Sequence, residues 1–274
     1  MWHRQVFLFL VFAGLVPNAT RGQFAEEDEG ESIKISAGRP ASGEILPDLV
    51  ASAKIIVTRT NDFRRNEGHR NVEVNLKLTK TAQYFADFMA RTDKYGHHAD
   101  GHGPAERAKE HDYDYCSVSE NIAYQFSSAG FTSKELAKGY FQAWKHSPGH
   151  PKNMLDADVT QTGVSVARSE QSGYYYAVQM FGRPKSMNIE VQITNNSDAV
   201  IQYSIGSWTF PLPPRLTRSH QRCRPTELTI KWPDEQESTA VQTRSGDHFT
   251  IVRQESGKLH IREDRAKRTE KEAQ

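Results

Sequence analysis

A change of periodicity near Lys185 divides this chain of 274 residues into two parts with different expected folds. Before it, segments with apolar residues at helical spacing alternate with strand-like runs, as in an α/β domain. After it, only short runs rich in β-branched and aromatic residues remain, separated by Asn, Asp, Pro, Gly and Ser. The sequence therefore predicts a three-layer α/β domain over 46–184 and a small all-β domain, a sandwich or partial barrel, over 185–262.

Helical spacing predicts three long helices in the first part. The first starts near Leu46, and the second has Thr79 as its expected N-cap. Thr132 or Ser133 caps the third, which ends at 147–149, because proline disfavours helical torsions before it and glycine accepts unusual ones. The residues at helical spacing are Leu49, Val50, Ala53, Ile56, Val57 and Thr60, then Ala82, Phe85, Ala86, Met89 and Ala90, then Leu136, Tyr140, Ala143 and Trp144.

Strands complete both parts. In the first, 162–167 and 174–181 alternate or are rich in aromatic residues, and a turn at 170–173 joins them. The second contains six runs whose alternation suits a half-buried sheet, namely MNIEVQIT, AVIQYSIG, WTFPL, ELTIKW, HFTIV and KLHI. The proline-rich PLPPR at 211–215 is expected at a sheet edge or a turn.

The N-terminus has the features of a secretory signal peptide. Arg4 precedes the apolar run VFLFLVFAGLV at 6–16, which has the length of a secretory core and is too short to span a bilayer. Small residues at Ala19 and Gly22 offer cleavage sites, and an uncleaved anchor is the alternative. We therefore expect a signal peptide at 1–22, no membrane-spanning segment after its cleavage, and export to the periplasm or the extracellular space.

Charge does not favour a nucleic acid or an anionic membrane as a partner. The formal net charge is +1, and removing Arg4 and Arg21 with the signal peptide leaves 1 − 2 = −1. The segment 23–45 is acidic, rich in Ser and Gly and poor in apolar residues, so a solvated linker is expected there. A charged tail is expected at 263–274.

The two cysteines, Cys116 and Cys223, fall in different predicted domains. An exported protein permits a bridge between them, which encloses 223 − 116 = 107 residues. In the loop-entropy description such a bridge contributes roughly 4 to 5 kcal/mol. Two separate thiols that lie too far apart to join are the alternative.

Several motifs occur in a fixed order between 46 and 184. They are TRTNDFRRNEG, YGHHADGHGPAERA, SENIAYQ, WKHSPGHPKNML, TGVSVA and YYYAVQMFG. In this order they resemble the CAP superfamily (cysteine-rich secretory, antigen 5 and pathogenesis-related-1 proteins), in its bacterial SCP-like branch. The resemblance implies an α-β-α sandwich with a shallow cleft, and it does not by itself imply a reaction.

The resemblance also implies a cleft built from two histidines and two glutamates. His97 in YGHHADGHGP matches the first histidine, with His98 as the competing assignment one residue on. Glu120 in SENIA matches the first glutamate, and His150 in SPGH matches the second histidine. The position of the second glutamate carries Ser147, which removes a negative charge from any cation site there.

Two interpretations of His97, Glu120 and His150 remain open. Two imidazoles and one carboxylate suit zinc with an open fourth position for water, so a divalent cation is a candidate cofactor. The same groups can instead hold one another by hydrogen bonds, with Glu120 orienting a histidine. His98 and His102 extend the first interpretation to a metal cluster in the loop. Solvated roles are expected for His69, His111 and His146.

Signatures of enzymes are weak. The run at 163–167 approaches G-x-S-x-G but lies in an alternating strand and lacks the last glycine. A Ser147–His150 pair, or Ser119 with a histidine, also needs an oriented base and an oxyanion site before it can hydrolyse a substrate.

The sequence therefore predicts a secreted, non-enzymatic CAP-domain module that binds a lipid, a peptide, a cell-wall fragment or a divalent cation in its cleft. The β domain is expected to contact a cell surface or a protein. The alternative is a metal-assisted hydrolase or peptidase in which His97 and His150 hold an activated water and Glu120 acts as the base. A third interpretation is a structural extracellular protein whose cleft has no ligand.

Overall fold

The computed structural model of this chain describes residues 33–34, 45–233 and 237–264. The expected signal peptide at 1–22 lies outside the described residues, as does the expected tail beyond Asp264. Most of the expected linker also lies outside them. Within that linker, Ile33–Lys34 form strand β1, which pairs with β3 (Lys94–Tyr95) in a two-stranded sheet.

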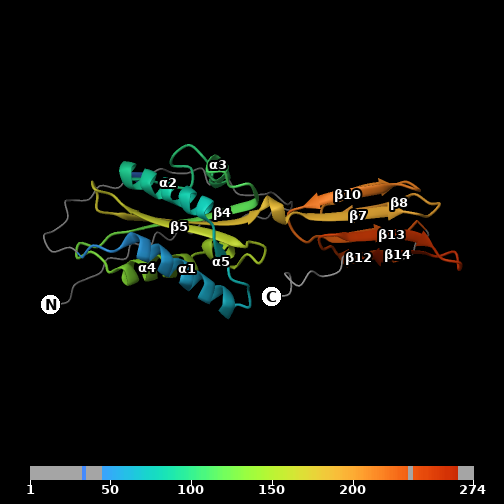
Figure 1. The fold of residues 1–274 in the computed structure, drawn as a ribbon, viewed down its shortest axis with the longest axis horizontal. Coiled ribbons are helices and arrows are strands. Elements are labelled where there is room, and N and C mark those ends of the chain that lie inside the picture. Colours follow the sequence, from blue (N-terminus) through green and yellow to red (C-terminus); the bar gives the residue numbers. More distant parts are fainter. Residues whose placement is uncertain (1–32, 35–44, 234–236, 265–274) are drawn as a thin grey trace, which may run out of the picture.

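A four-stranded sheet forms the middle layer of the first domain (Figure 1). Its order is β2-β5-β6-β4, with β2 parallel to β5 and the other pairs antiparallel. The strands are β2 (Glu73–Val74), β4 (Tyr115–Gln125), β5 (Gln161–Arg168) and β6 (Tyr175–Pro184). The sequence pattern predicts β5 and β6 but not β4, the edge strand that contains the SENIA motif.

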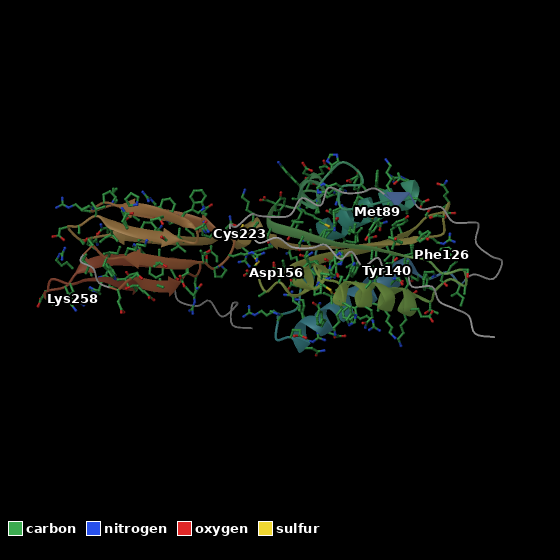
Figure 2. The ribbon with its side chains drawn as sticks, turned by 180° about the vertical axis from the view of Figure 1, so that it is seen from behind. Met89, Phe126, Tyr140, Asp156, Cys223 and Lys258 are labelled. Carbon is green, nitrogen blue, oxygen red and sulfur yellow. A yellow bond between two sulfur atoms is a disulfide. The ribbon has the colours of Figure 1, made fainter. Side chains whose placement is uncertain are left out.

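Helices cover both faces of this sheet, with α2 and α3 on one side and α1, α4 and α5 on the other (Figure 1). The helices are α1 (Leu49–Asn66), α2 (Leu76–Thr92), α3 (Pro104–Glu110), α4 (Ser133–Lys145) and α5 (His150–Leu155). Each face has its own apolar core, and Met89 and Tyr140, one from each core, lie on opposite sides of the sheet (Figure 2). This arrangement confirms the predicted α-β-α sandwich.

The helix ends follow capping chemistry, with one correction. Thr132 caps α4 as expected, in a capping box with Glu135. The prediction of Thr79 as the cap of α2 is wrong, because the Asn75 side chain accepts hydrogen bonds from the backbone N–H groups of the first turn and α2 begins three residues earlier than Thr79. Val50 also departs from the predicted apolar face of α1, since 66% of it is exposed.

Gly163 allows α2 to cross β5 at close range. A Cβ atom at this position would lie 2.2 Å from the Leu78 carbonyl carbon and 2.2 Å from the Thr79 nitrogen, so only glycine fits. The glycine that opens the G-x-S-like run is therefore a packing residue. Ser165 of the same run is buried and its hydroxyl contacts the Gln83 side chain at 2.6 Å, so no nucleophile elbow forms there.

The second domain is a sandwich of two four-stranded sheets, which confirms the predicted all-β fold. Their orders are β10-β7-β13-β14 and β12-β11-β8-β9, and alternate residues of both sheets form one apolar core. The strands are β7 (Ile189–Asn195), β8 (Ile201–Ile205), β9 (Trp208–Leu212), β10 (Thr217–Arg222), β11 (Glu227–Lys231), β12 (Thr239–Gln242), β13 (Asp247–Arg253) and β14 (Leu259–Asp264). The sequence analysis missed β10 and β12. The PLPPR run closes edge strand β9 and turns toward β10, as expected.

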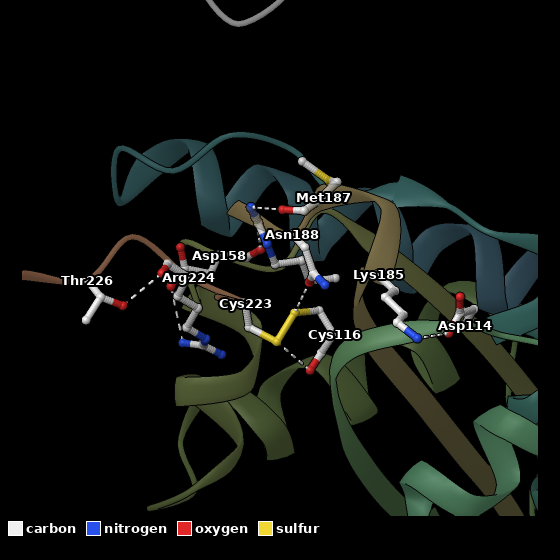
Figure 3. Close-up of a disulfide and its surroundings, with 10 residues drawn as sticks. Asp114, Cys116, Asp158, Lys185, Met187, Asn188, Cys223, Arg224 and Thr226 are labelled. Atoms are coloured by element: carbon white, nitrogen blue, oxygen red, sulfur yellow. Dashed lines mark hydrogen bonds and ion pairs between the residues drawn. A yellow bond between two sulfur atoms is a disulfide. The ribbon is translucent and has the colours of Figure 1, made fainter. Parts of the chain in front are cut away.

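A disulfide and an ion-pair cluster join the two domains (Figure 3). Cys116 at the start of β4 is bridged to Cys223, which follows β10, so the bridge predicted as one alternative is formed. Arg224 pairs with Asp156 at 2.6 Å and with Asp158 at 3.3 Å, both just beyond α5. A short 3₁₀ turn, Lys185–Met187, makes the covalent connection between β6 and β7. Cys223 and Asp156 both lie at the junction, whereas Lys258 lies at the far end of the second domain (Figure 2).

Candidate functional site

His97 and Glu120 meet at the edge of the central sheet. Glu120 is on edge strand β4, and its side chain has no exposed surface. His97 is in the loop after β3, where glycines 96 and 101 take positive φ angles of 139° and 88° that allow the chain to fold back. The His97 Nδ1 atom lies 2.8 Å from Glu120 Oε1. The structure therefore places His97, and not His98, against the carboxylate.

Arg107, on the buried face of α3, fixes the same carboxylate from the other side. Its guanidinium donates to both Glu120 oxygens, at 3.0 and 2.9 Å, and to Asp100 at 2.8 Å. It also donates to the backbone oxygens of His97 and His102, and it lies 3.5 Å from the centre of the Phe85 ring. Sequence reasoning missed Arg107. The available signal was an arginine within a short helix that follows the histidine loop.

These partners assign the tautomer of His97. A carboxylate paired with a guanidinium is ionised and only accepts hydrogen bonds, so Nδ1 of His97 carries a hydrogen and donates it to Glu120. In the neutral ring, Nε2 then has a lone pair, and it has no partner among the described residues. The pair is thus a carboxylate-oriented imidazole with its second nitrogen available.

His150 is held by Ser147 at the break between α4 and α5. The Ser147 hydroxyl lies 2.7 Å from His150 Nδ1 and donates to the Trp144 carbonyl at 3.0 Å. Because that hydroxyl gives its hydrogen to Trp144, Nδ1 of His150 donates to Ser147, and Nε2 is again the acceptor. Burial, with a smaller contribution from His97, lowers the pKa of His150 from 6.5 to about 4. The ring is therefore neutral at physiological pH.

Two asparagines tie the helix that carries His150 to the strand that carries Glu120. The Asn153 amide of α5 donates to the Asn121 side chain at 2.9 Å and to the Glu120 carbonyl at 3.2 Å. Asn121, fully buried on β4, donates to the His150 carbonyl at 3.4 Å. Asn121 thus has a structural role, and α5 and β4 are held together at the site.

Side chains also occupy the outer backbone edge of β4 beside the site. The Trp144 indole N–H donates to the Ile122 carbonyl at 3.0 Å, and the Tyr95 hydroxyl donates to the same oxygen at 3.2 Å. Trp144 is fully buried, so the tryptophan of the W-x-x-SPGH motif joins α4 to the edge strand. A buried carbonyl without such partners would be costly.

The three-ligand zinc site considered from the sequence does not fit this geometry. Glu120 offers no free oxygen, because Arg107 holds both and His97 shares one. Across the described ranges, no group of three or more His, Cys, Asp or Glu side chains is placed to hold a metal ion. Glu120 supports His97 rather than acting as a ligand.

The remaining histidines do not join this site. His98 is exposed and lies against Gly103, and His102 pairs with Glu110 at 3.2 Å on the surface, so the loop cluster is not formed. His111 and His146 each place Nδ1 near a backbone oxygen of their own helix, Arg107 and Gln142 respectively. The partly exposed His69 follows the end of α1.

Residues 57–181 match the model of the family described as "CAP: Cysteine-rich secretory protein family". YkwD of Bacillus subtilis (strain 168) is 28% identical over 161 residues, which are 58% of this chain and 58% of YkwD. This chain thus spans less than two thirds of the length of that relative.

Among solved structures, an outer surface protein from Borrelia burgdorferi is 19% identical, with a TM-score of 0.43 over 48% of this chain and 92% of that one. An extracellular protein containing a SCP domain from Bacillus anthracis str. Ames is 21% identical, with a TM-score of 0.42 over 49% of this chain and 41% of that one.

Proposed function

The chain belongs to the CAP superfamily through residues 57–181, and from this we propose that it is an exported binding protein without catalytic activity. Its ligand carries hydroxyl or amine groups, as a peptide or a cell-wall fragment does, and these groups donate to the Nε2 atoms of His97 and His150. The tautomers of the two rings support this ligand class, because Nε2 of the neutral His150 ring is an acceptor and Nε2 of His97 is an acceptor in the neutral form of that ring.

The observation that carries the proposal is the state of Glu120. A general base must reach the proton that it removes, and a nucleophile needs a base that orients it. Glu120 has no exposed surface, and both of its oxygens accept from Arg107. The hydrolase alternative, which assigns Glu120 as the base, therefore has less support than binding. Ser147 is equally unsuited as a nucleophile, since its hydrogen is donated to the Trp144 carbonyl.

Export is supported by two features. The expected signal peptide at 1–22 directs the chain out of the cytoplasm, and the Cys116–Cys223 bridge suits an oxidising compartment. Within the described ranges no helix combines the length and the apolar character that crossing a bilayer requires. Both domains then face the same exterior medium, where the β domain is free to contact a partner.

Imidazole ¹⁵N chemical shifts test the binding proposal. A chitin trisaccharide, which offers hydroxyl donors, and a trialanine peptide, which offers an amine, are titrated separately into the protein. We expect the Nε2 signals of His97 and His150 to move with at least one probe, while those of the surface histidines His69 and His146 stay in place. Unchanged Nε2 signals at millimolar concentrations of both probes would contradict the proposed ligand class.

An activity panel of peptides and esters tests the absence of catalysis. We expect no turnover above that of the His97→Ala/His150→Ala variant. Hydrolysis that is abolished both by a chelator and by Glu120→Gln would replace binding with the metal-assisted hydrolase.

A further inference from the structure

The second domain contains a long stretch without acidic residues. Between Asp198 and Glu227 the sequence has no Asp or Glu and no Lys, and its basic side chains are arginines together with one histidine, His220. The arginines are Arg215, Arg218, Arg222 and Arg224. The stretch comprises β8, β9 and β10, of which β9 and β10 are edge strands.

Strands β9 and β10 are edges of different sheets, and their side chains meet. The Arg218 guanidinium lies 5.1 Å from the centre of the Phe210 ring, and His220 Nε2 lies 2.7 Å from the Tyr203 hydroxyl. Because side chains alternate along a strand, Arg218, His220 and Arg222 share the face of β10 that is directed toward β9. We call this side, formed by β9 and β10, the arginine edge.

Trp208 shows that the space between the two sheets is open to solvent at the arginine edge. Trp208 lies on the same face of β9 as Phe210 and Leu212, and these two residues belong to or pack against the sandwich core. Leu212 is fully buried, whereas 63% of Trp208 is exposed. A tryptophan on an inner face with this exposure lacks the covering strand or side chains that its neighbours have.

The backbone and the charges of β10 also lack partners on this side. β10 pairs with β7 along one edge, and within the described ranges no hydrogen bond reaches the backbone of Thr217–Arg222 from the other. Arg224 is paired with aspartates of the first domain. Arg215, Arg218 and Arg222 have no carboxylate partner among the described residues, and Arg218 contacts only the Tyr203 hydroxyl at 3.5 Å by hydrogen bonding.

We propose that the arginine edge receives an extended acidic peptide segment of a partner protein as an added strand beside β10. The free backbone edge would supply main-chain hydrogen bonds, as in other cases of strand addition. Side chains on one face of a strand repeat about every 6.6 Å. Carboxylates at alternate positions of the added strand therefore lie opposite Arg218, His220 and Arg222, and the strand covers part of Trp208.

The residues present favour an acidic strand over other occupants. Guanidinium groups bind carboxylates through two parallel hydrogen bonds, and the basic side chains here are arginines without lysine. A second copy of β10 would bring like charges together, which disfavours pairing of the chain with itself. An anionic polysaccharide would satisfy the charges but would leave the backbone edge unpaired.

Titration calorimetry and amide exchange on the full chain test the proposal. The probe is a blocked ten-residue peptide of alternating Glu and Thr, and its counterpart has Lys in place of Glu. We expect the acidic peptide to bind and to slow hydrogen exchange of backbone amides within Thr217–Arg222, while the basic peptide does neither. Equal binding of both peptides, or binding without protection of β10, would overturn the proposal.

A charge-reversal pair locates the site. Arg218→Glu/Arg222→Glu should weaken binding of the acidic peptide at least about tenfold, because two attractive pairs between an arginine and a peptide carboxylate become repulsive. The matched control, Lys258→Glu/Arg262→Glu, makes the same change of net charge at and just before β14, the other edge of the same sheet, and should change the affinity by less than about twofold. Equal weakening by both variants would show that binding depends on the overall charge of the protein and not on the arginine edge. Polygalacturonate that binds tightly without protecting β10 would assign the edge to polysaccharides instead.

Discussion

Arg107 links the loop that carries His97 to the strand that carries Glu120. Its guanidinium has no exposed surface, and it balances two buried carboxylates, Asp100 and Glu120. A buried carboxylate without a counter-charge would either take up a proton or move into solvent together with the loop that carries His97. In either case His97 would lose its fixed acceptor. The arrangement of His97 and Glu120 therefore depends on a residue that itself has no contact with solvent.

Replacement of Arg107 tests this dependence. Arg107→Ala leaves two buried carboxylates without their guanidinium counter-charge, so we expect the free energy of unfolding to fall by about 3 to 5 kcal/mol. Urea denaturation at pH 7 measures the change. The control is Arg65→Ala, which breaks the exposed ion pair with Asp62 and should cost less than about 1 kcal/mol. Similar losses in the two variants would contradict the role given to Arg107.

His150 makes stability depend on pH in a defined interval. Its pKa is about 4 in the folded protein and 6.5 as the ordinary value, so between these pH values the unfolded chain binds a proton that the folded chain does not. Its contribution to stability is complete above pH 6.5 and is lost as the pH falls toward 4. We expect His150→Asn to flatten the fall in melting temperature over this interval. The exposed His146→Asn should leave the curve unchanged, and parallel curves for all three proteins would refute the shift.

At the scale of elements, mutations at the start of α2 distinguish Asn75, the observed N-cap, from Thr79, the N-cap expected from the sequence. Asn75→Ala removes an acceptor for the backbone N–H groups of Lys77 and Leu78, so we expect a loss of about 1 kcal/mol. Thr79→Ala removes only a hydroxyl that donates to the Asn75 carbonyl within the first turn, and should cost clearly less. Thermal unfolding of the two variants measures the difference. A larger loss for Thr79→Ala would restore the sequence-based assignment.

Periodicity and capping chemistry predicted most elements, because the relevant contacts are local. The SPGH break, the Thr132 cap and the β5–β6 hairpin all follow from neighbouring residues. Strand β10 was missed because its sequence, TRSHQR, contains no apolar residue, and its identity depends on pairing with β7. The same limit applies to the site. Motifs selected His97, Glu120 and His150, whereas the contact of Arg107 with Glu120 arises only when α3 packs on β4.

At the scale of the molecule, the disulfide and the Arg224 ion pairs attach the second domain on or just beyond elements that carry the candidate site. Cys116 is on β4, four positions before Glu120, and the bridge to Cys223 encloses a separation of 107 residues. Arg224 contacts Asp156, which directly follows the helix that begins at His150. The second domain is thus attached to β4 and to the residue that follows α5, and we expect it to act as a brace that holds these two elements in place.

Loosening this brace should be detectable at the histidines. Cys116→Ser/Cys223→Ser is expected to lower stability by roughly 4 to 5 kcal/mol in the loop-entropy description and to shift the imidazole signal of His97, which is held by β4. Arg224→Ala is expected to shift the signal of His150 through the end of α5. The control, Arg253→Ala, breaks the pair with Asp198 within the second domain and should move neither signal. Histidine spectra that stay unchanged in the cysteine and Arg224 variants would show that the second domain is only tethered, because a brace that can be removed without moving β4 or α5 transmits nothing to His97 or His150.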